Sequence, residues 1–284
     1  MSSATGISKA NRAYSRIGGL VAIVVTAVVF LVPFAFIFLT ASKDRAEASM
    51  LQFSWPTQWA FFENLQEVFE HRDGIIITAF INSTLLTVGS IAIMVILSAM
   101  VGYVLQRRKS KWNPLINFLV LAGLIVPPAV VPTIWVMQAL GIYKTLHGLI
   151  FIEVAFGMSF CILMFRAFVA SIPRELDEAA IMDGAGPVRL FFRVIFPLLR
   201  SVIVTVIVVQ AVTVFNDFQN PLYFLPGDDG ATLQVVLYAL QGQFSTQWNL
   251  MFMNILVIMV PMLIMYVFFN RQIVAGMTSG AVKG

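Results

Sequence analysis

Residue types that support catalysis are sparse in this chain. Its two histidines, His71 and His147, are far apart in sequence, and its single cysteine, Cys161, lies inside an apolar run. The sequence contains no G-x-x-x-x-G-K-S/T loop that would cradle a nucleotide phosphate. It also has no group of cysteine and histidine residues at metal-ligand spacing. We therefore predict no catalytic residue, no metal site and no cofactor bound by this chain.

The densest group of charged side chains lies in the stretch Ser171–Leu199, between two long apolar runs. Ser171 can cap a helix, and Pro173 suits a first helical turn. Acidic side chains favour the positive end of the helix dipole, and three of them follow at once. Gly184 can end this helix in the left-handed conformation, and Pro187 can begin a second helix. The three acidic residues are Glu175, Asp177 and Glu178.

The second predicted helix of this stretch has an apolar stripe at i, i+3, i+4 and i+7. In the first helix, Ala179 and Ala180 offer a small surface for close contact, while Glu178 and Asp183 offer charge. Two interpretations follow from the residues alone: solvated helices that link two spans, or a handle that another protein grips. The stripe consists of Val188, Phe191, Phe192 and Ile195, with Arg189 and Arg193 outside it.

The composition is that of an integral membrane protein. Of the 284 residues, 59% are hydrophobic and 11% are charged, whereas soluble domains are about 25% charged. Six apolar stretches are long enough to cross about 30 Å of hydrocarbon as helices. The first exceeds the roughly 7–15 residues of a signal-peptide core, so we predict an uncleaved span. The six stretches are Ile17–Leu39, Ile81–Leu105, Leu115–Ala139, Leu149–Ala170, Leu198–Phe215 and Leu250–Phe269.

The distribution of lysine and arginine predicts the orientation of the spans. With the N-terminus in the cytoplasm, only four of the 18 basic residues fall on the outer side. Both termini and the stretch Ser171–Leu199 are then cytoplasmic. This topology also explains the isoelectric point of about 9.4, so we predict no nucleic-acid partner. The four outer basic residues are Lys43, Arg45, Arg72 and Lys144.

Aromatic and small residues near the first two spans have a structural interpretation. Trp55 and Trp59 fit an anchor in the headgroup layer, and the alternative is a docking surface for an outer partner. Gly89, Ser98 and Gly102 allow the second span to approach a neighbouring helix closely. We predict helix packing as the role of these three small residues.

Prolines and one carboxyl group interrupt the third and fourth spans. Three prolines predict a kink in the third span. The kink either allows the helices to pack or forms a bent wall of a solute pathway. Glu153 opens the fourth span, where its side chain can reach water at the outer end; a proton relay is the alternative. The prolines are Pro127, Pro128 and Pro132.

Four polar or aromatic residues are candidates for contact with a transported solute. Each also fits helix–helix hydrogen bonding or interfacial anchoring, and both interpretations are open. The candidates are Trp135, Gln210, Asn216 and Asn254.

Four features of the sequence resemble known permeases. One stretch resembles the EAA loop of importer-type ABC transporter permeases in its residues and their spacing. It consists of Glu178-Ala179-Ala180, three further residues, Gly184, nine further residues and Val194-Ile195-Phe196-Pro197. The tail Gly276–Gly284 is similar to the maltose-permease-like branch of carbohydrate importers. So are Asn82-Ser83 and the stretch Phe215-Asn216-Asp217-Phe218, which Pro221-Leu222 follows.

This resemblance implies a type I ABC importer permease fold and a set of partners. The partners are a second homologous permease, a dimer of ATPase subunits that bind ATP and magnesium, and an extracytoplasmic sugar-binding protein, all at a bacterial-type inner membrane. The implied ATPase-coupling residues are Glu178, Ala179, Ala180, Asp183, Gly184, Arg189 and Pro197. The implied contacts of the tail with the ATPase are Ser279, Gly280 and Lys283.

We therefore expect an all-α integral membrane protein with six transmembrane helices that imports a sugar. An ABC importer of another solute and an ion-coupled secondary transporter are the alternatives, and the latter would require ionisable groups at mid-membrane. The expected segments are tail 1–16, first span 17–39, outer loop 40–80, core 81–270 with the coupling loop 171–197, and tail 271–284.

Overall fold

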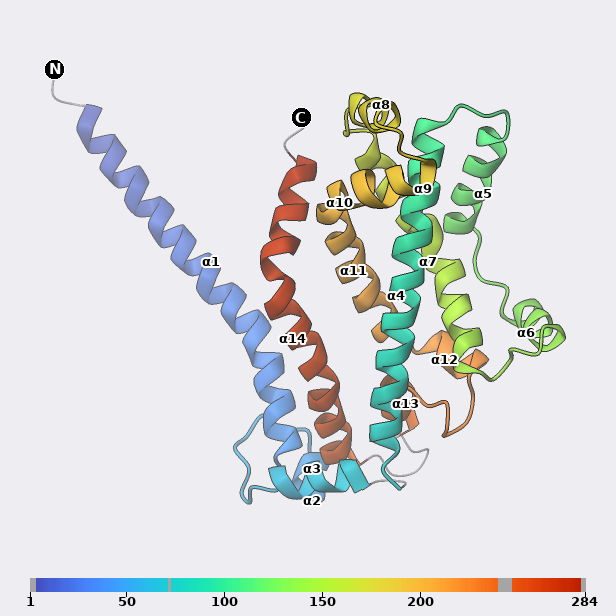
Figure 1. Ribbon diagram of the computed structural model, residues 1–284. Helices are drawn as coiled ribbons and strands as arrows, with labels where there is room; N and C mark the ends of the chain where they lie inside the picture. Colours follow the sequence, from blue (N-terminus) through green and yellow to red (C-terminus); the bar gives the residue numbers. More distant parts are fainter. Residues whose placement is uncertain (1–3, 71–72, 240–246, 282–284) are drawn as a thin grey trace. The chain divides into compact units, whose positions relative to one another are not determined.

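The computed structural model describes residues 4–70, 73–239 and 247–281, and all regular elements in these ranges are helices (Figure 1). The all-α class predicted from the sequence is thereby confirmed. The helices are α1 Ala4–Ala41, α2 Arg45–Ser49, α3 Phe61–Glu70, α4 Ile75–Arg107, α5 Asn113–Ile125, α6 Val130–Ala139, α7 Leu146–Val169, α8 Glu175–Met182, α9 Pro187–Leu190, the π-helix η1 Phe191–Ile195, α10 Phe196–Leu198, α11 Arg200–Phe215, α12 Gln219–Phe224, α13 Leu233–Ala239 and α14 Trp248–Ala281.

Four helical segments are long and apolar enough to cross a membrane: Val21–Ala41 of α1, α4, α7 and Trp248–Phe268 of α14. Two further pairs pass the same test but are sharply bent. The α5–α6 pair bends by 117°, and the segment Pro187–Leu198 meets α11 at 76°. If each bent pair is one span, the described residues contain up to six spans, the number expected from the sequence.

The chain divides into two compact units. The first comprises residues 1–70 and 240–258, and the second comprises residues 71–239 and 259–284. In the first unit, the buried Lys43 ammonium donates to the Gln52 carbonyl and to Ser54 Oγ, at 2.8 Å each. The buried Asn64 amide donates to the Ala41 and Lys43 carbonyls at 2.9 and 2.7 Å. These bonds hold the loop after α1 against the end of that helix.

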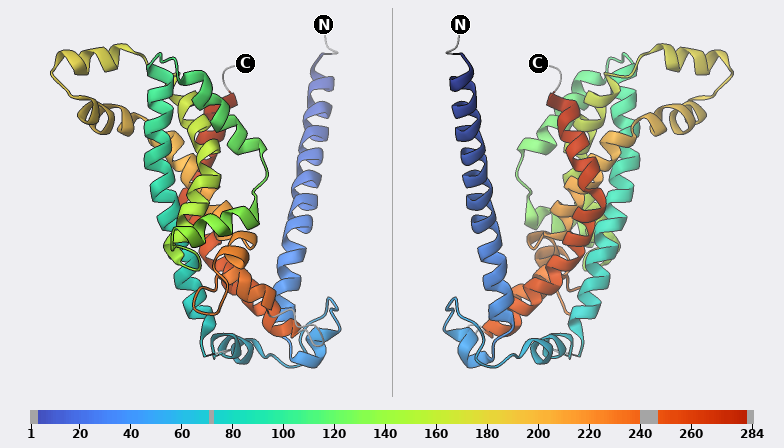
Figure 2. Two further views of the ribbon diagram at one scale, coloured as in Figure 1. Left: turned by 90° about the vertical axis from the view of Figure 1, so that its right-hand side faces the viewer. Right: turned by 90° about the vertical axis from the view of Figure 1, so that its left-hand side faces the viewer.

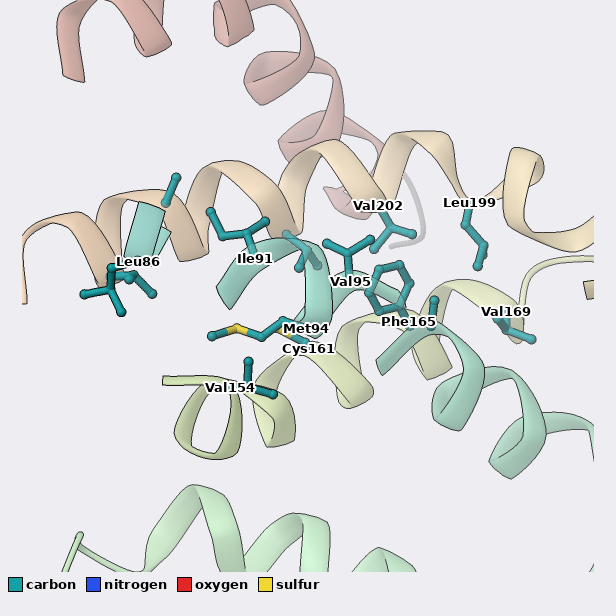
Figure 3. Close-up of a cluster of buried hydrophobic side chains, with 14 of the residues drawn as sticks. Leu86, Ile91, Met94, Val95, Val154, Cys161, Phe165, Val169, Leu199 and Val202 are labelled. Carbon is teal, nitrogen blue, oxygen red and sulfur yellow. The ribbon is translucent and has the colours of Figure 1, made fainter. Parts of the chain in front are cut away.

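The core of the second unit lies where α4 and α11 pack on α7 (Figure 3). Met94 of α4 and Cys161 and Phe165 of α7 are fully buried there. Gly102 permits this packing, because a Cβ atom at this position would lie 2.9 Å from the Arg166 amide nitrogen on α7. The predicted use of small residues in the second span for close helix packing is confirmed at Gly102.

The third predicted span is broken rather than kinked. Pro127 and Pro128 lie in a non-helical break between α5 and α6, and Pro132 lies inside α6. Two consecutive prolines remove two helical hydrogen bonds, and each favours an extended conformation in the residue before it. The chain therefore leaves the direction of α5 completely, and α6 is a separate short helix.

The connection between α7 and α11 differs from the sequence prediction in two details. Ser171 does not cap α8; its hydroxyl donates to the Phe168 carbonyl at the end of α7. The predicted apolar stripe is wrong for Val188 and Phe192, which are exposed, whereas Leu190 is buried. Phe192 lies in the π-helix η1, whose wider turn shifts which residues share a face, whereas Val188 lies before it in α9. Because Pro197 has no N–H, an α-helical bond to the carbonyl four residues earlier cannot form there.

Candidate functional site

The helices α8 and α9 form a projection from the second unit. In both views of Figure 2 they extend sideways from the end of α4. A tight turn separates the two helices: Gly184 has φ +76°, and the Ala185 amide donates to the Ala180 carbonyl at 3.0 Å. The left-handed end that the sequence predicted at Gly184 and the new helix at Pro187 are both confirmed.

The outer surface of this projection has both charged and apolar side chains. Ile181, Met182 and Val188 are 57%, 86% and 70% exposed, which is unusual for apolar side chains in such a short connection. Ala180 is half-buried and packs on the core. Such a surface is typical of a site where another protein binds. The other predicted coupling residues are all exposed: Glu178, Ala179, Asp183, Gly184, Arg189 and Pro197.

The inner side of α8 is fastened to the end of α4. Asp177 is only 8% exposed, and its carboxylate accepts a hydrogen bond from the Tyr103 hydroxyl. Arg107 Nη2 forms an ion pair with Asp177 Oδ2 at 3.0 Å, although the geometry is not that of a hydrogen bond. The same nitrogen donates a hydrogen bond to the Ile172 carbonyl at 2.9 Å. The sequence predicts Asp177 in the first turn of the helix but does not indicate this contact, because the partners of Asp177 lie some 70 residues earlier in the chain.

A cavity of about 480 Å³ lies between α7, α11 and α12. Its wall on α7 consists of residues at i, i+3, i+4 and i+7, which share one face of a helix. Its wall on α11 includes Gln210 and Thr213, four residues before Asp217. The residues on α7 are Glu153, Phe156, Gly157 and Phe160, and Val209 and Asn220 complete the lining.

The polar groups of the cavity are held in place by one another. Asn220 Nδ2 donates to Glu153 Oε1 at 3.0 Å, and the Asp217 side chain lies against the same carboxyl group. Gln210 Nε2 lies 3.1 Å from Cys161 Sγ. Glu153 is only 5% exposed, and its carboxyl group lies in the lining of the cavity. The lining described here contains carboxyl, amide and hydroxyl groups and two phenyl rings, with no lysine, arginine or histidine.

The other candidates for solute contact lie elsewhere. Trp135 on α6 is 66% exposed and does not line the cavity. Asn216 ends α11 next to the cavity, where its Oδ1 accepts from Gln234 Nε2 at 3.1 Å. Asn254 of α14 belongs to the first unit; it is fully buried, and its amide has no hydrogen-bond partner among the described residues.

The predicted tail contacts are Ser279 and Gly280, which lie in α14, and Lys283, which lies outside the described residues. Among the described residues, no group of three histidine, cysteine or carboxylate side chains could hold a metal ion.

Comparison with known proteins identifies relatives along nearly the whole chain. Residues 94–274 match the family model described as binding-protein-dependent transport system inner membrane component. The melibiose/raffinose/stachyose import permease protein MelC of Bacillus subtilis is 31% identical over 95% of this chain and 97% of its own length. The diacetylchitobiose uptake system permease protein NgcG of Streptomyces coelicolor is 30% identical over 92% of this chain and 87% of its own length.

A solved structure shows a similar fold. One chain of a bacterial ABC transporter involved in the import of the acidic polysaccharide alginate superimposes with a TM-score of 0.77. The match covers 92% of this chain and 97% of that one, at 20% sequence identity. At this level of identity the likeness concerns the fold alone.

Proposed function

The chain belongs to the family of binding-protein-dependent transport system inner membrane components, and we propose that it is the permease subunit of an ABC importer that carries a sugar into the cell. It is a transport subunit and not an enzyme. Family membership also excludes the ion-coupled secondary transporter, which the sequence alone left open as an alternative. Hydrolysis of ATP, with its magnesium ion, takes place on separate partner subunits.

The observation that carries the sugar assignment is the match over nearly the full length to sugar permeases. MelC and NgcG are import or uptake permeases for neutral or N-acetylated oligosaccharides by their names, and each is at least 30% identical to this chain. Two relatives named for different sugars match nearly the whole of this chain in sequence. We infer that a carbohydrate is the solute, while the particular sugar depends on side chains that differ between relatives.

The cavity between α7 and α11 has the chemistry that a sugar requires. Sugar hydroxyl groups both donate and accept hydrogen bonds, and the cavity offers acceptors at Glu153 and Asp217 and donors at Gln210 and Asn220. The apolar C–H faces of a sugar ring pack on aromatic rings, which Phe156 and Phe160 supply. A volume of about 480 Å³ lies within the range of small-molecule sites. We propose this cavity as the part of the solute pathway that this chain contributes.

The projection α8–α9 is the proposed seat of the ATPase subunit. Its exposed apolar tip at Ile181 and Met182 can enter a cleft, while Glu178 and Arg189 can pair with charges at the rim. The lysine and arginine distribution supports a cytoplasmic position for this projection and for both termini. A second homologous permease and an extracytoplasmic binding protein complete the proposed complex. Residues Ser279, Gly280 and Lys283 remain predicted contacts of the tail.

The proposal is tested by uptake of radiolabelled sugars in a strain that lacks this chain. Restoring the chain should restore ATP-dependent uptake of at least one neutral oligosaccharide from a panel that includes raffinose and diacetylchitobiose. Gln210→Ala should lower that uptake about 10-fold, whereas Thr205→Ala on the same helix, outside the cavity, should leave it unchanged. Uptake that depends on the chain for amino acids or peptides, but for no saccharide in the panel, would contradict the sugar assignment.

A further inference from the structure

We propose that Asp177 is a positioning residue that locks α8 to α4, so that a partner pushing on α8 moves the spanning helices instead of bending the connection. The proposal rests on the proposed function, because it supplies a mechanical step for an ATP-driven permease. It concerns a side chain that faces away from the partner surface, so its role differs from that of the exposed residues of the projection.

Without a specific tie, α8 would be a poor lever. It has eight residues, and the segments on either side of it, around Pro173 and Gly184, are not helical. A short helix between two non-helical segments can turn about them when it is pushed. A force on the exposed tip at Met182 would then be absorbed by the connection and would not reach the membrane-spanning helices.

The contacts of Asp177 remove this freedom. Tyr103 and Arg107 are four residues apart at the end of α4 and therefore project from the same face of that helix. Both reach the Asp177 carboxylate, one through the hydroxyl and one through the guanidinium. Arg107 also donates to the Ile172 carbonyl, which precedes α8. One residue of α4 thus fixes both the first turn of α8 and the chain that leads into it.

Because the ion pair is buried, each of its charges needs its partner. The side chains of Arg107 and Asp177 are only 12% and 11% exposed, so water solvates neither charge well. Each charge is therefore stabilised mainly by the other. Removing one partner leaves a desolvated charge behind. The outer face of α8 is organised differently, because Glu178 and Glu175 are exposed to solvent. Partner binding and anchoring to α4 are therefore separated onto two faces of one short helix.

The tie connects with the wall of the cavity through close helix packing. Tyr103 directly follows Gly102, where α4 approaches the backbone of α7 at Arg166. Helix α7 in turn carries Glu153 and Gly157 in the cavity. A displacement of α8 that moves α4 must therefore also move α7 or separate two helices in backbone contact. A rigid path from the projection to the cavity follows from these contacts.

The test uses the assembled transporter, with its second permease, ATPase subunits and binding protein, reconstituted in proteoliposomes. Sugar uptake and ATP hydrolysis are measured on the same preparation. For Asp177→Asn and Arg107→Gln we expect normal co-purification with the ATPase, hydrolysis within twofold of the unmodified transporter, and at least a 10-fold loss of sugar moved per ATP. The charge exchange that combines Asp177→Arg with Arg107→Asp should recover at least a third of that ratio.

Two further variants separate positioning from a loss of fold. Tyr103→Phe removes one hydrogen bond and no charge, and should lower the ratio about threefold even if Asp177→Asn fails to assemble. Glu175→Gln lies on the same helix in an exposed position and should behave as the unmodified protein. An unchanged ratio in Asp177→Asn overturns the proposal. So does a proportional loss of hydrolysis and uptake, because that would show a docking or folding role.

A spectroscopic measurement reads the tie without depending on any sugar. Spin labels at Met182→Cys and Val104→Cys, both exposed, report the distance between α8 and α4, while the native Cys161 is buried. We expect one narrow distance distribution with and without ATP, and a broad one in Asp177→Asn. Identical distributions would refute the lock. If the unmodified transporter moved no sugar but kept the narrow distribution, the proposed function would fail while the lock would stand.

Discussion

Replacing Gly102 with alanine tests whether α4 and α7 touch as closely as the structure shows. The added Cβ would lie 2.9 Å from both the Arg166 amide nitrogen and Phe165 Cβ, and 3.2 Å from the Ile162 carbonyl oxygen. Two of these atoms belong to the backbone of α7 and the third is fixed directly to it. None can rotate away, so the two helices must separate for the methyl group to fit.

The magnitude follows from a comparison with Gly89, which lies in the interior of the same helix. Overpacking against rigid atoms costs about 1–3 kcal/mol. At Gly89 a Cβ would meet Ile150 Cδ1 at 3.0 Å, the end of a flexible side chain that can change rotamer. Both substitutions gain the same helix propensity, about 1 kcal/mol. That gain cancels in the comparison, so Gly102→Ala should be less stable than Gly89→Ala by about 1–3 kcal/mol.

The buried Cys161 provides the assay. Its thiol is fully buried on α7, one residue before Ile162, and it is the single cysteine of the chain. A maleimide dye that fluoresces on reaction will therefore report thermal unfolding in detergent or nanodiscs. For a chain of this size about 1 kcal/mol corresponds to roughly 2–4 °C in Tm. Equal Tm values for Gly102→Ala and Gly89→Ala would refute the close approach of α4 and α7.

Three further tests concern the cavity, the loop after α1 and the projection. Replacing both carboxyl groups of the cavity, Glu153→Gln together with Asp217→Asn, should raise uptake of an acidic trisaccharide relative to a neutral one, because a like charge about 6 Å away costs roughly 3 kcal/mol at an effective dielectric constant of about 20; an unchanged ratio in competition assays would show that these carboxyl groups do not face the solute. Lys43→Met leaves the Gln52 carbonyl and the Ser54 hydroxyl without their donor, so limited proteolysis of the loop after α1 should become faster, whereas exposed Lys144→Met should have no effect. Gly184→Ala, at φ +76°, should cost about 1 kcal/mol and weaken co-purification with the ATPase, whereas Gly186→Ala, at φ −69° and equally free of neighbours, should do neither.

The sequence predicted best those features that local chemistry decides. The left-handed turn at Gly184 and the new helix at Pro187 depend on the backbone freedom of one residue and the ring of another. The apolar spans depend on a simple excess of hydrophobic side chains over about 20 positions. In each case the determining residues are neighbours in sequence, and the structure agrees at Gly184, at Pro187 and for the four unbroken spans among the described residues.

Predictions failed where a distant contact or a change of helical period decided the outcome. The stripe that included Val188 and Phe192 assumed an α-helical period, which the π-helix before Pro197 does not keep. The cavity joins Glu153 to Asp217 and Asn220, more than 60 positions later, and no local pattern indicates that pairing. Of the predicted solute residues, only Gln210 lines the cavity.

Gly157 shows why the specificity of such a cavity depends on polar groups more than on size. A Cβ at this position would lie 2.6 Å from Met94 Sδ on α4 and 3.3 Å from Gln210 Nε2 on α11. The wall of the cavity is therefore also the contact that joins three helices, and a larger side chain would disturb the core as well as fill the space. By contrast, a carboxyl group can replace an amide at Asn220, or an amide can replace the carboxyl group at Glu153, with almost no change in volume. In the proposed solute pathway, such exchanges would change the preferred sugar while the packing of α4, α7 and α11 stays the same.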